Sequence, residues 1–287
     1  MIGVLAGTGV TGSQVVAALR KKGADFKCIV RNPDAARQKL GGDVALVQGD
    51  LSDRASLDAA FAGLDTLYLL CGHSPMLGEM EKNGLEAAKQ AGVGYIVKSS
   101  GSEKGITPDA PSKILQMHHR MEQEVRNSGV KWAILRPNYF MSNLMAMAEP
   151  IAKAGKMITA LPPETEISMI HPADIGECAA ELLTDDGRAG DSYFVTGQVV
   201  SMSNVAEELS SQLGREIEYV KVAPEAAAGA MAEKGMPDWL IAHLGGIMGL
   251  ASQGAMKGTT DWVEKLTGHA PRTIGDWIGA NKGAFGG

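Results

Sequence analysis

The sequence predicts an α/β protein with a doubly wound parallel sheet and a smaller, mainly helical C-terminal lobe. Short apolar runs alternate with helical stretches over the first two-thirds of the chain, which is typical of parallel strands joined by helical crossovers. A glycine-rich turn between Gly7 and Gly12 directly follows the first apolar run and opens a helical stretch. After Leu135 methionine and glycine become frequent, and helical segments dominate.

Seven apolar runs are expected to form the sheet, with helices between them. The strands are expected at Ile2–Ala6, Phe26–Val30, Ala45–Gln48, Thr66–Leu70, Tyr95–Ser99, Trp132–Leu135 and Tyr193–Val195. The main helices are expected at Val10–Lys22, Ser56–Phe61, Glu79–Ala91 and Gln116–Ser128. We therefore expect residues 1–150 to form a dinucleotide-binding domain and residues 151–287 a substrate-binding lobe. The two are expected to interleave, because a strand near 193–195 returns to the sheet.

The composition is that of an ordinary globular protein, with 45% hydrophobic and 21% charged residues in a chain of 287. The net charge is −6 and the acidic residues are scattered, which argues against a nucleic-acid partner. Three cysteines far apart, Cys28, Cys71 and Cys178, fit a reducing compartment and predict neither a disulfide framework nor a metal site.

No apolar run approaches the roughly 20 residues needed to cross a bilayer. Met1 leads straight into a strand-like run, so no leader peptide is expected. We therefore expect a cytoplasmic protein without a membrane partner, and the sequence is compatible with a homodimer.

The glycine-rich turn is the most specific motif in the chain. It consists of Gly7, Thr8, Gly9, Val10, Thr11 and Gly12. In such a turn the first glycine permits the tight bend, the second lets backbone approach a pyrophosphate, and the third allows close helix–sheet packing. The helix N-terminus offers free N–H groups and a partial positive charge to the phosphates. The motif therefore predicts dinucleotide binding by a Rossmann-type domain.

The residue at the end of the second strand indicates which dinucleotide binds. Proteins that bind NAD usually carry an acidic residue there, which accepts hydrogen bonds from the ribose. This chain has Arg31, nineteen residues after Gly12. A guanidinium offers paired donors to phosphate oxygens, so Arg31 favours NADP(H), although a surface arginine in a loop is the alternative.

With these residues assembled, the sequence resembles the NmrA-like group of atypical short-chain dehydrogenases/reductases over essentially its whole length. The matching segments are Gly7–Gly12, Arg31–Pro33, Gly49–Leu51, Ser56–Leu57, Ala60–Gly63, Ser99–Ser100, Ser128–Val130, Leu135–Asn143, His171–Ile175 and Leu266–Thr273. Each fragment alone is modest, but their order and spacing are specific. Within the group, the sequence is most similar to the NADPH-dependent quinone, azo and dye reductases.

The resemblance implies further contacts to the cofactor. It places Asp50 and Leu51 beside the adenine, and Leu70, Cys71 and Gly72 beside the adenosine ribose. It places Ser99 and Ser100 at the nicotinamide side, with Pro137, Asn138, Tyr139 and Phe140 passing under the nicotinamide. Many relatives carry a glycine where Ala6 stands, and we expect alanine to be small enough for the turn to survive.

The resemblance also exposes a missing catalytic motif. Short-chain dehydrogenases usually place Tyr-x-x-x-Lys on the helix after the fifth strand, and here those positions hold Ile114 and His118. Isoleucine cannot donate a proton, so the machinery for reducing simple ketones is absent. Quinones and delocalised dyes depend less on a positioned acid. His118 is the candidate catalytic residue, to orient the acceptor or supply a proton; a helix-surface histidine beside His119 is the alternative.

The acceptor pocket is expected to have an adaptable lining that includes thioethers. Its candidate residues are Tyr139, Phe140, Met141, Met145, Met231, Met236 and Trp239. Asp174 and Glu177 match a capping box that opens a helix toward Leu183, so Asp174 and His171 are expected to be structural.

Two functions remain open for this sequence. The first is an NADP(H)-dependent oxidoreductase that transfers hydride to a quinone-like or other conjugated aromatic acceptor without the tyrosine acid. The second is a redox-sensing regulator that binds NADP(H) without turning it over. Regulators of the group tend to be longer, with appended partner-binding segments that are not evident here, which favours the enzyme.

Overall fold

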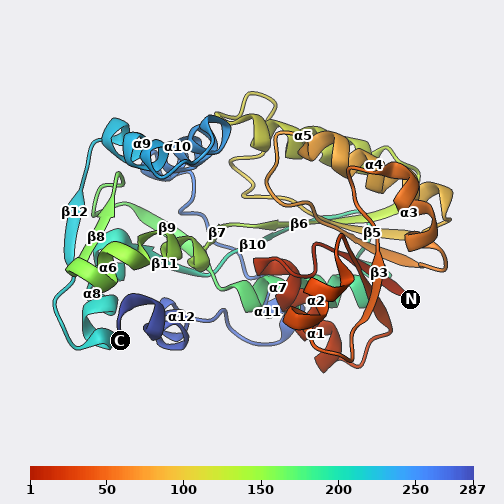
Figure 1. Cartoon of the computed structure of the whole chain (residues 1–287), viewed down its shortest axis with the longest axis horizontal. Coiled ribbons are helices and arrows are strands. Elements are labelled where there is room, and N and C mark those ends of the chain that lie inside the picture. The colour runs from red at the N-terminus through yellow and green to blue at the C-terminus, as the bar shows by residue number, and fades with distance from the viewer.

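A seven-stranded parallel sheet runs through the computed structural model, which describes residues 1–287 (Figure 1). Its strands are β1 (Ile2–Leu5), β2 (Phe26–Val30), β3 (Ala45–Gln48), β4 (Thr66–Leu69), β5 (Tyr95–Ser99), β6 (Lys131–Pro137) and β10 (Ser192–Val195). The strand order is β10-β6-β5-β4-β1-β2-β3. The order reverses between β1 and β4, where a doubly wound sheet opens a crevice for ligands. The predicted Rossmann-type fold is confirmed.

Helices cover both faces of this sheet, as the apolar character of its strands requires. One face carries α1 (Val10–Lys21), α2 (Pro33–Leu40), α7 (Pro172–Thr184) and α11 (Trp262–Thr267). The other carries α3 (Arg54–Phe61), α4 (Leu77–Gln90) and α5 (Lys113–Arg126). Each face has its own core of buried aliphatic side chains, and the central strands contribute to both.

A second lobe lies beyond the β6–β10 side of the sheet (Figure 1). Its strands are β7 (Tyr139–Phe140), β8 (Lys156–Thr159), β9 (Glu166–Ile170), β11 (Gln198–Ser201) and β12 (Glu218–Lys221). Its helices are α6 (Ala148–Ala154), α8 (Met202–Leu213), α9 (Pro224–Glu233), α10 (Asp238–Ser252) and α12 (Ile274–Ala280). Three short 3₁₀ turns complete the chain, η1 (Met141–Met147), η2 (Asp186–Arg188) and η3 (Lys282–Phe285). The lobe is mainly helical, as predicted, but also contains a three-stranded and a two-stranded sheet.

The chain returns twice from the second lobe to the sheet layer, first at α7 and β10 and again at α11. After β9 in the lobe, α7 returns to pack against α1, and β10 then pairs with β6 in parallel, with Tyr193 opposite Leu135. Both α7 and β10 come after residue 150 in the chain but pack in the sheet layer. The division into residues 1–150 and 151–287 itself stays a prediction. No helix combines the length and apolarity that crossing a bilayer requires.

The start of α7 differs from the prediction. The helix begins at Pro172, and the ring Nδ1 of His171 accepts a hydrogen bond of 3.0 Å from the Ala173 N–H. The capping box expected at Asp174 is wrong, because that carboxylate lies inside the helix. Asp174 is fully buried and accepts a hydrogen bond of 2.9 Å from the Arg272 backbone N–H.

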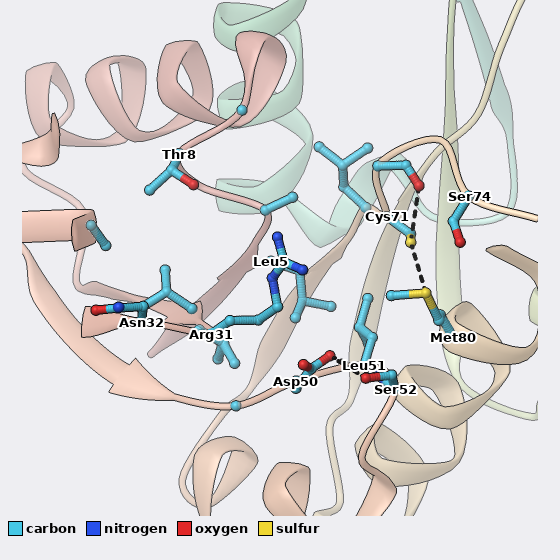
Figure 2. Close-up of a pocket in the computed structure, with 18 of the residues that line it drawn as sticks. Leu5, Thr8, Arg31, Asn32, Asp50, Leu51, Ser52, Cys71, Ser74 and Met80 are labelled. Carbon is cyan, nitrogen blue, oxygen red and sulfur yellow. Dashed lines mark hydrogen bonds between the residues drawn. The ribbon is translucent and has the colours of Figure 1, made fainter. Parts of the chain in front are cut away.

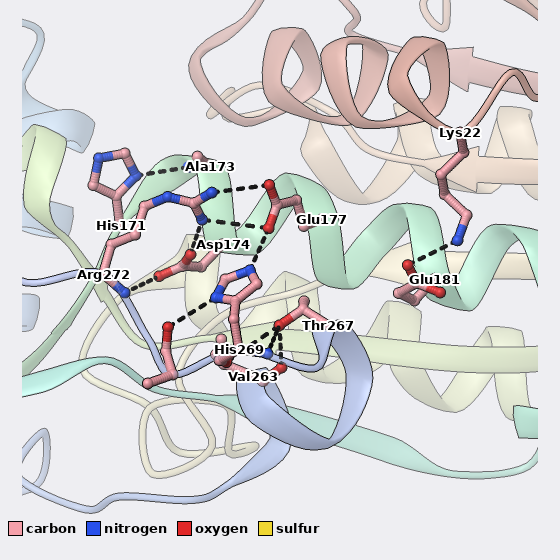
Figure 3. Close-up of polar contacts among 11 residues, drawn as sticks. Lys22, His171, Ala173, Asp174, Glu177, Glu181, Val263, Thr267, His269 and Arg272 are labelled. Carbon is pink, nitrogen blue, oxygen red and sulfur yellow. Dashed lines mark hydrogen bonds and ion pairs between the residues drawn. The ribbon is translucent and has the colours of Figure 1, made fainter.

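Glu177 completes an ion-pair network that anchors the C-terminal segment to α7 (Figure 3). Its Oε1 lies 2.9 Å from Arg272 Nη2, and its Oε2 lies 2.6 Å from His269 Nε2. Asp174, Glu177 and His269 are close enough together to resemble a metal site. The Arg272 guanidinium already supplies the positive charge between the two carboxylates, so the cluster is explained as an ion-pair network.

Candidate active site

The glycine-rich turn has the shape that a dinucleotide phosphate requires. A Cβ at position 12 would lie 2.1 Å from the Ala6 carbonyl oxygen, so only glycine fits there. Gly9 is the N-cap of α1 and provides no side-chain cap, and the first turn of the helix has no acidic residue. The N–H groups at this helix N-terminus are therefore available to an anion. The residues present fit the predicted cofactor.

Ala6 occupies a backbone conformation that glycine normally takes. Its φ is 52°, the only positive value at a non-glycine residue. The turn does survive with alanine, as expected, because Ala6 O still accepts a hydrogen bond of 2.9 Å from the Gly9 N–H. An alanine in the left-handed backbone conformation costs on the order of 1 kcal/mol of stability. This cost explains why the family resemblance predicts a glycine at this position.

A cavity of about 800 Å³ opens at the carboxyl ends of β1 to β4, beside this turn (Figure 2). Eight of the predicted cofactor residues line it: Thr8, Gly9, Arg31, Asp50, Leu51, Leu70, Cys71 and Gly72. Gly7, Val10, Thr11 and Gly12 do not line the cavity but form the turn and the first residues of α1. The structure therefore brings together residues from four strand ends that are up to 64 positions apart in the chain.

Arg31 follows β2 and reaches into the middle of this cavity, between Thr8 and Asp50 in Figure 2. Its guanidinium makes no hydrogen bond to the protein, and Lys39 on α2 adds a second cation that the sequence reasoning missed. Across the cavity, the backbone N–H of Ser52 donates a hydrogen bond to Asp50 and is the main cause that lowers the pKa of this carboxyl, helped by Arg31. Asp50 is therefore an anionic acceptor for hydroxyl or amino groups.

Cys71 lies at the end of β4 and is buried. Its Sγ donates a weak hydrogen bond of 3.2 Å to the Gly72 carbonyl and lies 3.9 Å from the Met80 sulfur. Burial raises the pKa of this thiol to about 12. The thiolate is the reactive form of cysteine, so Cys71 is placed as an inert wall of the cavity.

A second cavity, of about 900 Å³, lies between the carboxyl ends of β5 and β6 and the helices α9 and α10. His73 lines both cavities, so the two adjoin. Eight of the predicted residues line the second cavity: Ser100, His118, Pro137, Asn138, Tyr139, Phe140, Met231 and Met236. More than half of the lining residues, 19 of 35, are hydrophobic, as suits a flat apolar ligand.

Four of the predicted site residues lie elsewhere. Met141 is fully buried in the core of the second lobe, and Met145 is 42% exposed on the surface. Trp239 packs against the core on the α4–α5 face of the sheet. Ser99 is buried and lines neither cavity. Residues that are neighbours in the chain can lie either at the cavity wall or in the core behind it. Their spacing in the sequence does not show which of them lines the cavity.

His118 is buried on α5 and is 6% exposed, so the alternative of a helix-surface histidine is wrong. Ile114, one helical turn earlier, belongs to the core that α4 and α5 share, where it can offer no proton. Burial is the main cause that lowers the pKa of His118 well below its ordinary value, and the Lys98 charge adds to it. His118 is therefore a neutral imidazole at the edge of the second cavity.

Two groups around His118 were missed by the sequence reasoning. Lys98, on β5, is fully buried and lies 3.0 Å from the Glu81 carboxylate and 3.2 Å from His118 Nδ1. His243, on α10, lines the same cavity, with its Nδ1 2.7 Å from the Ser112 hydroxyl. The sign of this cluster in the sequence is the lysine inside the apolar strand Tyr95–Ser99. A charged side chain in a buried strand needs a partner, so this lysine indicates a buried polar cluster.

Several polar atoms around the second cavity have no partner in the protein. They are Ser100 Oγ, Ser102 Oγ, Asn138 Oδ1 and His243 Nε2. A buried polar atom without a hydrogen bond costs free energy. Their concentration around one cavity indicates a site that is built to hydrogen-bond a ligand.

Comparison with known proteins agrees with this geometry. The chain is 35% identical to the NAD(P)H azoreductase of Xenophilus azovorans over 287 residues, which is 100% of this chain and 99% of the relative. It is 27% identical to quinone oxidoreductase 2 of Escherichia coli over 284 residues, 97% of each chain.

A similar solved structure is the NADPH-dependent quinone oxidoreductase QOR2 of Escherichia coli, complexed with NADPH. It superposes with a TM-score of 0.88 at 26% identity and covers 98% of this chain and 100% of its own. The model of the NmrA-like family matches residues 1–262. With the Rossmann sheet, the glycine-rich turn and this match in place, the chain belongs to the NmrA-like family.

Proposed function

We propose that this protein is an NADPH-dependent reductase of quinone-like or other conjugated aromatic acceptors, and that it works without the tyrosine acid of short-chain dehydrogenases. The observation that carries the proposal is the pair of adjoining cavities that share His73, one with a phosphate-binding turn and one with an apolar lining. Reductase names among full-length relatives, an azoreductase and a quinone oxidoreductase, support the same activity.

The residues of the first cavity suit NADPH. The N–H groups at the start of α1 would hold the pyrophosphate, and Arg31 and Lys39 would hold the 2′-phosphate. Asp50 would accept hydrogen bonds from the adenosine end. The bound NADPH supplies the hydride, and Pro137 to Phe140 would carry its nicotinamide at the mouth of the second cavity.

The second cavity would stack a flat acceptor against the nicotinamide and exclude water. Proximity and orientation supply much of the rate in such a transfer. His118 lies at the wall of this cavity, and Ile114 cannot act as an acid. Hydride transfer to a quinone leaves a much less basic oxygen than transfer to a ketone, so this arrangement suits a conjugated acceptor.

Turnover of a panel of quinones, azo dyes and enones with NADPH, followed by absorbance, tests the proposal. We expect turnover with at least one acceptor and a loss of up to about 100-fold in His118→Ala. His119→Ala is the matched control, because His119 lies on the same helix and lines neither cavity. Ile114→Tyr should hardly raise turnover.

Two other outcomes would change the proposal. Tight NADPH binding without turnover of any acceptor would favour the redox-sensing regulator. Turnover that is equal in wild type and His118→Ala would leave the reductase standing and remove His118 from its mechanism.

A further inference from the structure

Lys98 is the centre of a buried polar cluster that the proposed reaction does not yet use. It stands on β5 and meets Glu81 from α4 and His118 from α5, inside the core on that face of the sheet. Its side chain and that of Glu81 are both fully buried. A charge in this position is costly unless it is paired and fully hydrogen-bonded, so its partners define its role.

The hydrogen bonds of Lys98 account for every proton on its ammonium group. Nζ lies 3.0 Å from Glu81 Oε1 and 3.2 Å from His118 Nδ1, and it is in contact with the Ser99 carbonyl oxygen. An ammonium has three hydrogens to donate and cannot accept. Three acceptors therefore match three donors, whereas a neutral amine would have only two hydrogens for them.

This arrangement determines where His118 keeps its own proton. Because Nδ1 accepts a hydrogen bond from Lys98, the proton of the neutral ring is on Nε2. No protein group is hydrogen-bonded to Nε2, and the ring lines the second cavity. A second positive charge on the ring would lie directly against the Lys98 ammonium, so the imidazolium is disfavoured.

We propose that Lys98, held in place by Glu81, is a positioning residue that fixes His118 as the neutral Nε2–H tautomer, which donates a hydrogen bond to an oxygen of the acceptor. The part of this proposal that concerns the acceptor rests on the proposed function. The part that concerns the tautomer of His118 does not depend on it. His118 then orients the acceptor and stabilises the negative charge that grows on its oxygen. It does not act as an imidazolium acid.

A second imidazole at the same cavity has the same arrangement. Ser112 Oγ accepts a hydrogen bond of 3.2 Å from the Ile114 N–H and lies 2.7 Å from His243 Nδ1. Its hydroxyl hydrogen has no other acceptor, so it donates to Nδ1 and leaves the proton of His243 on the unpartnered Nε2. The other charged or titratable groups facing His118 are His73 and His243, and both disfavour its protonation. The cavity is thus lined by donors from neutral rings.

The test must remove the charge of Lys98 without leaving Glu81 unpaired. Breaking one half of a buried ion pair is strongly destabilising, so the variant is the double substitution Glu81→Gln/Lys98→Met. The matched control is Asp174→Asn/Glu177→Gln/Arg272→Met, which neutralises a buried carboxylate, its neighbour Glu177 and the cation that they share, but on the opposite face of the sheet. Both variants are first checked by circular dichroism and NADPH binding.

Nitrogen NMR of histidine-labelled, full-length protein saturated with NADP⁺ reads the tautomer directly, with His118→Asn used to assign the signal. We expect wild type and the control to show Nε2–H and to stay neutral down to about pH 6. In Glu81→Gln/Lys98→Met nothing donates to Nδ1, so we expect a larger share of the Nδ1–H form than in wild type, and protonation at a higher pH. Wild-type His118 with the proton on Nδ1, or charged near neutral pH, would overturn the proposal, as would an unchanged double variant.

The pH dependence of kcat gives a second reading, which distinguishes a neutral donor from an imidazolium acid. The wild-type kcat should be flat between about pH 6 and pH 8, because a neutral donor does not titrate there. A kcat that falls as pH rises through the ordinary histidine range would show an imidazolium acid and refute the positioning role. If no acceptor is reduced, the proposed function fails, while the NMR experiment still decides the tautomer.

Discussion

The proposed contact between Arg31 and the 2′-phosphate can be tested at a single side chain. Its guanidinium lines the first cavity without a hydrogen bond to the protein, so it is available to the 2′-phosphate. Charge-assisted hydrogen bonds of this kind contribute roughly 1.5–3 kcal/mol. Arg31→Ala should therefore weaken NADPH binding by about 10- to 150-fold, while NADH, which lacks the phosphate, should hardly change. Titration of both cofactors into both proteins measures this.

Lys39 is a second cation of the same cavity, so the effect of its removal on NADPH affinity can be compared with that of Arg31. Its ammonium lines the same cavity but forms no bidentate pair with phosphate, so Lys39→Ala should weaken NADPH by less than Arg31→Ala. Raising the salt concentration should reduce NADPH affinity more than NADH affinity in wild type. Equal losses for the two cofactors, or a wild type that prefers NADH, would contradict the assignment of Arg31.

The reactivity of the Cys71 thiol distinguishes a reductase from a redox sensor. With its pKa raised to about 12 by burial, the fraction of thiolate at pH 8 is about one in ten thousand. We expect slow labelling by thiol reagents in the folded protein, rapid labelling after denaturation, and little effect of Cys71→Ser on NADPH affinity. Rapid labelling that NADPH blocks would instead support a redox-sensing role.

At the scale of elements, the contact between α1 and α7 depends on one glycine. A Cβ at Gly176 would lie 2.5 Å from the Gln14 carbonyl carbon on α1. Gly176→Ala should destabilise the protein by about 1–3 kcal/mol through overpacking, measured by denaturant unfolding. Gly249 in α10 is the matched control, since nothing lies within 4 Å of its added Cβ. Gly249→Ala should be neutral or stabilising, as is usual in helices, and equal effects of the two substitutions would contradict the role of Gly176.

The sheet layer was predicted well because its signals are local. Each of the seven predicted strands agrees with a structural strand to within two residues at either end, as Phe26–Val30 shows without any shift. The second lobe was predicted less well, because strands such as β8 and β12 contain only two apolar residues each and give no clear apolar run. The first turn of α7 was misread because a histidine ring, not an aspartate, caps it.

Eight residues that line the first cavity could be predicted from the sequence because they follow strand ends at motif spacing. The polar cluster behind His118 could not, because Glu81, Lys98 and His118 come from three elements and meet only when α4 and α5 pack on β5. The same limit explains the methionines. Met231 and Met236 line the second cavity, whereas Met141 faces the core of the lobe, and composition cannot distinguish these environments.

At the scale of the whole molecule, the C-terminal segment joins the second lobe to the sheet layer. It leaves α10 in the lobe, passes along α7 through α11, and ends in the lobe with α12 (Figure 1). His269 and Arg272 hold it against α7 through Glu177 and Asp174 (Figure 3). The segment therefore packs against the sheet layer through Val263 and Leu266 and against the lobe through Ile274 and Trp277.

This attachment should depend on pH through His269. A hydrogen bond with the Ala270 carbonyl, and then one with Glu177, raises the pKa of His269 above its ordinary value. A histidine whose pKa is raised in the folded state contributes stability that is fully present below its unfolded pKa and is lost as pH rises through the folded pKa. Stability should therefore fall between about pH 6 and pH 8.5. The side chain is 39% exposed, so the contribution is small, up to about 0.5 kcal/mol.

Thermal unfolding of wild type and His269→Gln at both ends of this pH range isolates the effect, because other titrating groups are common to the two proteins. On warming at pH 6 the wild type should be the more stable, by up to about 2 °C in Tm for a chain of this size. At pH 8.5 the difference should shrink, since the neutral ring pairs less well with the Glu177 carboxylate. Glu177 itself should not interfere, because its pKa is lowered and it stays charged over this range. A Tm difference that is independent of pH would show that His269 holds the segment by packing alone.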